Sequence, residues 1–246
     1  MKTSNTAQEL FKTAYENRYT WDENFPGYSA NVELIQGQES YAGKIFIHRD
    51  LTVEVSEISE KQIQEGIYIQ LWDIVTHRKP TPFNESHGKH EFIKGSTDDT
   101  QLISIVVKGD SLDSAYKIRG REICQVTRVK GSTAFTIDTH ENLDTGEGYI
   151  ASRYDAVFRD VSTNEVQSIL KFEDTYKKIG KYYLMTKQVV QDSQDDKDTV
   201  TEFNYSNIRL LVPAMACIGH IRSKLLMIFF LVSLSACSPI SLPQLV

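Results

Sequence analysis

The chain has 246 residues, of which 40% are hydrophobic, 10% aromatic and 24% charged, and its formal net charge at pH 7 is -6. This length and apolar content suffice for one domain with a large core, and they exclude a disordered or low-complexity chain. Nucleic acid is excluded as a partner, because phosphate binding needs clustered lysine and arginine and here both charge signs are interspersed.

The cysteines and the N-terminus indicate the compartment. Cys124, Cys217 and Cys237 are odd in number and widely spaced, so they predict neither a disulfide framework nor a cysteine zinc site. We expect Cys124 to be a small core residue. The first residues, MKTSNTAQELFKTAYENRYTW, contain no apolar run of the length that a secretory signal needs. The sequence therefore predicts a cytoplasmic protein.

The N-terminal part predicts a helix followed by a strand meander. Thr6 and Glu9 have capping-box spacing, and a stripe of apolar residues follows at helical spacing: Ala7, Leu10, Phe11, Ala14 and Tyr15. Pro26 and Gly27 end this region. Residues 28–35, 41–47 and 51–55 alternate between apolar and polar, which predicts three antiparallel strands.

A second helix is predicted after the meander. Ser59 and Gln62 have capping-box spacing, and Lys79-Pro80 ends an apolar repeat formed by Ile63, Ile67, Leu71, Ile74 and Val75. This helix carries Trp72, and we expect it to cover one face of the sheet. Further strands are predicted around residues 90–94, 101–108, 115–119, 122–129 and 133–139, with glycines at several of the breaks.

Residues 149–211 predict four consecutive antiparallel strands. In the first, Ile150, Tyr154, Ala156 and Phe158 share one face, and Arg153 and Asp155 share the other. In the next, Asp174 is in phase with Leu170, Phe172 and Tyr176, so it faces the core and needs an arginine or a tyrosine hydroxyl as partner. The last stretch changes phase between Phe203 or Tyr205 and Ile208 or Leu210, which predicts a bulge.

These patterns predict an α+β fold with a curved antiparallel sheet, a half-barrel, and two helices. Residues 1–211 form one domain in this interpretation. Five separated segments, AYENRYTWDENFPGYSANV, QLWDIVTHR, FNESHGKHEFIKG, DTGEGYIASRYDAVFRD and FEDTYKKIGKYYLMTKQVV, resemble a family of cyanobacterial and plant-chloroplast proteins known only as a domain of unknown function. The order of elements is remotely similar to the lipoprotein-carrier fold (LolA/LolB-like). That resemblance implies acyl-chain binding by analogy alone.

No residue pattern in the chain fixes a reaction. His77, His87, His90 and His140 show no HExxH or comparable zinc spacing, so we expect no metal and no cofactor. No nucleophile motif is present. The enzymatic alternative is a hydrolase or isomerase that uses His87 or His140 with Glu147, and it requires these side chains to converge around a cleft.

The aromatic strands predict a non-enzymatic binding or assembly module. We expect the concave face beneath the helix that bears Trp72 to bind an apolar small molecule, such as a lipid or pigment, or a hydrophobic segment of a membrane-associated protein. The candidate lining residues are Trp72, Tyr149, Arg153 and Tyr154. A third hypothesis, a protein-interaction factor peripheral to the thylakoid membrane, follows only from the organisms of the resembled family. The sequence gives no oligomeric state.

The composition changes after Leu211, beyond which no aspartate or glutamate occurs. Residues 212–246 contain Arg222 and Lys224, an apolar run at 225–232, and a Leu-Ser-Ala-Cys motif ending at Cys237 that resembles a bacterial lipobox. We expect this tail to lie outside the domain and to derive from a frameshift or an in-frame join to the start of a neighbouring lipoprotein gene. The alternative is a tail anchor at 225–246, in which case the protein is membrane-bound.

Overall fold

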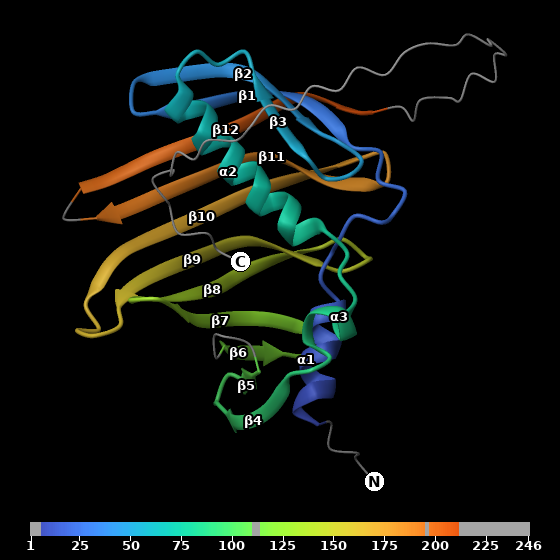
Figure 1. The fold of residues 1–246 in the computed structure, drawn as a ribbon, viewed down its shortest axis with the longest axis vertical. Helices are drawn as coiled ribbons and strands as arrows, with labels where there is room; N and C mark the ends of the chain where they lie inside the picture. The colour runs from blue at the N-terminus through green and yellow to red at the C-terminus, as the bar shows by residue number, and fades with distance from the viewer. Residues whose placement is uncertain (1–5, 110–113, 195–196, 212–246) are drawn as a thin grey trace, which may run out of the picture.

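The computed structural model describes residues 6–109, 114–194 and 197–211. It contains a single antiparallel sheet of twelve strands in the order β3-β2-β1-β12-β11-β10-β9-β8-β7-β6-β5-β4, with three helices (Figure 1). The sheet is open, since β3 and β4 are its two edge strands. The predicted α+β class with a curved antiparallel sheet is confirmed. The predicted tail at residues 212–246 lies outside the described residues.

The strands follow the chain in a long meander with one exception. Each strand from β4 to β11 pairs with the next strand in sequence, and β1 pairs with both β2 and the last strand, β12. The bounds are β1 Tyr28–Gln36, β2 Glu39–Ile47, β3 Val53–Ser56, β4 Glu91–Thr97, β5 Ile103–Lys108, β6 Ser114–Arg119, β7 Glu122–Lys130, β8 Thr133–Asp144, β9 Tyr149–Asp160, β10 Val166–Ile179, β11 Tyr182–Gln194 and β12 Lys197–Leu210.

The predicted N-terminal helix is α1, Ala7–Glu16, and its capping box is present. The Thr6 hydroxyl accepts a bond from the backbone amide of Glu9 at 3.2 Å, and the Glu9 carboxylate accepts one from the amide of Thr6 at 2.8 Å. Both bonds satisfy amides that have no partner inside the helix. The apolar face of α1 packs with Phe83 against β4 to β7.

Replacing Thr6 by alanine removes this cap and is expected to lower the melting temperature of the full chain by about 2 to 4 °C. Thr6→Ser is the matched control, because serine keeps the hydroxyl oxygen that accepts the bond. Differential scanning calorimetry of the three proteins makes the comparison, and equal melting temperatures for Thr6→Ala and the parent chain would show that this cap adds nothing.

The second predicted helix is α2, Lys61–Arg78, and its start differs from the prediction. Its N-cap is Glu60, which makes no side-chain cap bond, so the predicted Ser59–Gln62 capping box is wrong. A short helix that the sequence analysis did not predict, α3, spans Phe83–His87. Its five residues lie between two proline-containing turns and the strand β4, too short for a helical repeat to show.

Both long helices lie on the same face of the sheet. The strand register shows which residues of β6 to β9 share this face. The directly opposed pairs are Tyr116–Val126, Val126–Ile137 and Ile137–Ala156. Residues directly opposite each other in antiparallel strands project from the same face. Tyr116 contacts Phe11 of α1, so the side of α1 is also the side of Ala156.

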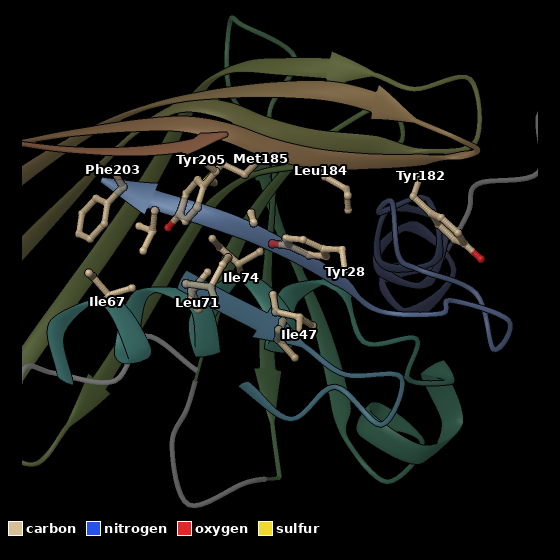
Figure 2. Packing of buried hydrophobic residues seen from close by; sticks show 14 of the residues in the cluster. Tyr28, Ile47, Ile67, Leu71, Ile74, Tyr182, Leu184, Met185, Phe203 and Tyr205 are labelled. Atoms are coloured by element: carbon tan, nitrogen blue, oxygen red, sulfur yellow. The ribbon is translucent and has the colours of Figure 1, made fainter. Parts of the chain in front are cut away.

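The main core lies between α2 and the strands around β1. Ile67, Leu71 and Ile74 of α2 point toward Phe203 and Tyr205 of β12 (Figure 2). The predicted bulge is present in β12, where Asn207 has φ +51° and the register with β1 shifts. The extra residue turns Ile208 and Leu210 onto the same core face as Phe203 and Tyr205. The bulge therefore explains the change of phase in the sequence, because it keeps both Phe203 and Tyr205 and Ile208 and Leu210 on the core face.

Within the described part of the chain, none of the helices combines the length and apolar character that crossing a lipid bilayer demands.

Candidate functional site

Part of the helix-bearing face carries a second apolar cluster, which shares only Val190 with the α2 core. We call this area the apolar floor. In Figure 1, α2 crosses the sheet obliquely, and the far parts of β8 to β10, toward the β9–β10 turn, have no described helix above them. The floor consists of Phe135, Ala156, Phe158 and Phe172, which are buried, and Ile137, Tyr154, Leu170 and Val190, which are partly buried.

The opposite face of the same strands is polar. Arg153 forms a salt bridge with Glu141 at 2.7 Å, and His140 lies 3.0 Å from the carboxylate of Asp155. Gln125 and Asp138 are hydrogen-bonded on the neighbouring strands. The aromatic residues of β8 to β10 are therefore confined to one side, as expected for strands that have one solvated face.

A buried polar group lies between the floor and the α2 core. We call it the Asp174 cluster, formed by Arg78, Asp174, Tyr176, Gln188 and Tyr205. Tyr176 donates to the Asp174 carboxylate at 3.0 Å and accepts from the Arg78 guanidinium at 3.2 Å, while the Gln188 amide donates to Asp174 at 2.8 Å. The predicted need of Asp174 for a tyrosine partner is confirmed, and arginine acts on it through that tyrosine.

The environment of Asp174 disfavours its charged form. Burial raises the pKa of Asp174 to about 6, and hydrogen bonds from Gln188, Tyr176 and Tyr154 oppose this rise in part. Tyr154 belongs to the floor as well, because its ring stacks on Phe172 with centroids 4.6 Å apart and planes at 10°. The floor and the Asp174 cluster are thus contiguous through Tyr154.

The four residues predicted to line the site do not come together. Trp72 follows Gln64 and Tyr68 at four-residue steps on α2, and Gln64 donates to the Val55 carbonyl of β3, so this flank faces β3. Asp73, on another flank, acts electrostatically on Tyr154. Trp72 therefore lies on the side of α2 away from the floor.

Tyr149 and Arg153 also lie elsewhere. Tyr149 is buried against α1, where its hydroxyl accepts from the Ile123 amide at 3.0 Å and donates to the Ala14 carbonyl at 3.5 Å. Burial raises the pKa of Tyr149 to about 12. Arg153 is half exposed on the polar face. Of the four candidates, only Tyr154 lies on the floor.

The residues of the enzymatic alternative are likewise separated. His87 belongs to α3 and lies against Phe11 and Tyr15 of α1, His140 pairs with Asp155 on the polar face, and Glu147 sits in the turn between β8 and β9. No described contact joins either histidine to Glu147. Among the residues that the structure describes, no group of three or more histidine, cysteine, aspartate or glutamate side chains is arranged to hold a metal ion.

Two surface hollows lie outside the floor. One of about 260 Å³ is lined by Tyr15, Glu16, Arg18, Thr20 and residues 80–83, and one of about 720 Å³ by His48, Arg49, Asp50 and Thr52. Arg18 in the first is held in place, since it covers the Tyr15 ring at 3.8 Å and donates to the Tyr15 carbonyl. Neither hollow adjoins Asp174.

Sequence reasoning missed Gln188 and Tyr205. Gln188 lies in a segment with no clean polar face, so its position within the sheet is not visible from alternation. The informative signal is register, because Gln188 stands directly opposite both Asp174 and Phe203. Register of strands that are paired through a bulge cannot be read from one sequence.

Comparison with solved structures finds remote likenesses over most of the chain. A putative outer membrane lipoprotein-sorting protein domain from Vibrio parahaemolyticus shares 13% identity, with 87% of this chain and 95% of that one covered and a TM-score of 0.33. A DUF1329 family protein from Desulfovibrio piger shares 11%, covering 83% and 91%, with a TM-score of 0.24. MucB from the Pseudomonas aeruginosa MucA/MucB complex shares 10%, covering 84% and 99%, with a TM-score of 0.22.

No curated protein matches the chain. One family model does match, over residues 2–211, and its description is "Protein of unknown function (DUF3386)". This confirms the expected membership of a family of unknown function, whereas cyanobacterial or chloroplast origin stays a prediction. The chain belongs to the DUF3386 family.

Proposed function

We propose that this protein is a non-enzymatic binding protein whose apolar floor holds an apolar small molecule alongside α2. The observation that carries the proposal is the apolar floor itself, an aromatic surface on the helix-bearing side of β8 to β11 that lies beyond the helix. Ligand sites are concave and mostly apolar, with a few polar groups that fix orientation. The floor and the adjoining Asp174 cluster supply both kinds of group.

The energetic basis is burial of the ligand's chain. Each methylene group removed from water contributes about 0.8 kcal/mol, so a chain of ten to twelve carbons gives useful affinity even after the cost of immobilising it. Phe135, Phe158 and Phe172 lie on neighbouring strands in one cluster with the small Ala156, and the partly buried members of this cluster are Ile137, Tyr154, Leu170 and Val190. An extended aliphatic or polyene chain fits this chemistry.

The enzymatic alternative has no comparable support. Its histidines and Glu147 lie in different parts of the fold, as described above, and Asp174 is surrounded by a tyrosine, a glutamine and an arginine rather than by a nucleophile. A lone carboxyl of raised pKa is insufficient for acid-base catalysis, which needs groups in matched positions. Binding is the function that the arrangement favours.

The test is native mass spectrometry of the full chain, followed by titration with the neutral fluorescent reporter N-phenyl-1-naphthylamine. Binding of the reporter with 1:1 stoichiometry, or an apolar molecule that co-purifies with the protein, is the expected result. Leu170→Glu puts a charge on the floor and is expected to weaken reporter binding at least about tenfold, because a charge must then be buried or displaced.

Val161→Glu is the matched control. Val161 lies in the β9–β10 turn and is 49% exposed, so the same charge there leaves binding unchanged. Circular dichroism shows whether both variants are folded. If the parent chain binds no reporter and carries no co-purified molecule, the proposal fails. If Leu170→Glu and Val161→Glu bind equally well, the ligand lies away from the floor.

A further inference from the structure

Two buried polar atoms of the Asp174 cluster have no hydrogen-bond partner among the described residues. They are the side-chain carbonyl oxygen of Gln188 and the hydroxyl of Tyr205. Gln188 is fully buried and Tyr205 is 5% exposed. Buried polar groups in folded proteins are nearly always paired, and an unpaired one costs about 1 to 3 kcal/mol. Two such atoms on neighbouring strands indicate that a bound group supplies their hydrogen bonds.

The two atoms belong to one patch. Gln188 stands opposite Phe203 on β12, and Tyr205 is the next residue of β12 on the same face. Asp174 and Tyr176 both act electrostatically on the Tyr205 hydroxyl. Asp174 and Tyr176 are partly exposed, whereas the Gln188 oxygen and the Tyr205 hydroxyl are closed to solvent, so a group that binds these two atoms has to enter past Asp174 and Tyr176.

The chemistry of the patch selects the polar group that it can hold. The Gln188 oxygen only accepts hydrogen bonds, whereas the Tyr205 hydroxyl both donates and accepts. A hydroxyl group matches this pair, since it donates to Gln188 and accepts from Tyr205. A carboxylate offers no proton to Gln188 and would lie beside the Asp174 carboxylate. An ammonium would lose its hydration near the Arg78 guanidinium.

We propose that the Asp174 cluster binds the hydroxyl head of a long-chain alcohol whose chain lies along the apolar floor. This proposal rests on the proposed function, because it needs the floor to hold the chain. Tyr154 connects the two parts, since it stacks on Phe172 and hydrogen-bonds Asp174. Gln188 and Tyr205 then determine which head group is accepted, and the aromatic residues of the floor bind any chain.

The test uses the full chain and four C12 probes that compete with N-phenyl-1-naphthylamine: 1-dodecanol, dodecanoate, dodecylamine and dodecane. 1-Dodecanol is expected to bind about 3- to 10-fold more tightly than any of the others. Tyr205→Phe keeps the side-chain volume and removes one partner, whereas Gln188→Met keeps the volume but also removes the amide that donates to Asp174. Each is expected to weaken 1-dodecanol about 2- to 10-fold and to leave dodecane unchanged, and the dodecane affinity reports any wider effect of the lost bond to Asp174.

Tyr116→Phe is the matched control, because Tyr116 is also buried on this face but its hydroxyl accepts from Arg128 at 3.0 Å, far along the sheet on β6. It is expected to leave all four affinities unchanged. Equal displacement by all four probes, or variants that keep the preference for 1-dodecanol, would show that a trapped water satisfies the two atoms, which overturns this inference and leaves the floor's role standing. Absence of any displacement and of reporter binding overturns both proposals.

Discussion

Replacing Trp21 by alanine is expected to lower the free energy of unfolding by about 3 to 5 kcal/mol, the usual cost of removing a large buried aromatic side chain. Trp21 is 1% exposed, stacks on Phe25 with ring centroids 4.1 Å apart, and meets the Tyr28 ring at 83°. Its indole also donates to the Tyr183 carbonyl at 3.3 Å. Together with Tyr19, Asp22 and Phe25, which contact Tyr182 or Tyr183, this side chain fixes the segment between α1 and β1 to β11.

The chain offers a matched control, since Trp72 is its only other tryptophan. Trp72 is partly exposed on the β3 side of α2, so Trp72→Ala is expected to cost about 1 kcal/mol or less. Urea unfolding followed by circular dichroism measures the free energy of unfolding of both variants and of the parent chain. A loss as large for Trp72 as for Trp21 would mean that α2 packs through a different face from the one described.

Raising the pH from 4.5 to 7.5 is expected to remove a stabilising contribution of Asp174. Its pKa of about 6 in the folded protein lies above the ordinary value of 3.8, so the folded protein binds this proton more tightly than the unfolded chain. The contribution is complete below about pH 3.8 and is lost as the pH rises through about 6. At 1.36 kcal/mol per pKa unit, the whole change from below pH 3.8 to well above pH 6 is roughly 3 kcal/mol, and about two thirds of it falls between pH 4.5 and 7.5.

Asp174→Asn removes the titration and keeps the shape, so its stability relative to the parent chain is expected to rise with pH across this window. Asp99→Asn is the matched control. Asp99 is exposed in the turn between β4 and β5, so this variant shows how removal of a surface carboxylate alone changes the free energy of unfolding. Urea unfolding of the three proteins at several pH values makes the measurement. If the free energy of unfolding of Asp174→Asn and that of the parent chain changed with pH in parallel, the raised pKa of Asp174 would be contradicted.

Alternation along single strands was sufficient to place many core residues. In β9, Ile150, Ala156 and Phe158 are buried on one face, and Arg153 is solvated on the other, as the pattern predicts. The same alternation shows that Arg153 and Tyr154 point apart, so period-two spacing already argued against grouping them in one site. Helix α3 was missed because five residues carry no period.

The site depended on information that single-strand patterns lack. Asp174 was identified because its own strand put it in phase with Phe172 and Tyr176. Arg78, Gln188 and Tyr205 reach it from α2, β11 and β12, and their approach is set by strand register, a bulge and the path of a helix. The place of the apolar floor also depends on the path of α2 across the sheet, and no residue type marks that path.

The pairing of β1 with β12 affects how the protein can fold as it is made. Strands β4 to β11 pair with sequence neighbours and can form as they leave the ribosome. Strands β1 to β3, in contrast, join the rest of the sheet only through the pairing of β1 with β12, which starts more than 160 residues after β1 ends. Until β12 emerges, the inner faces of β1 and α2 lack the Phe203 and Tyr205 side chains that cover them. Part of this N-terminal apolar surface therefore stays uncovered until β12 is made, and transiently exposed apolar surface of this kind favours aggregation.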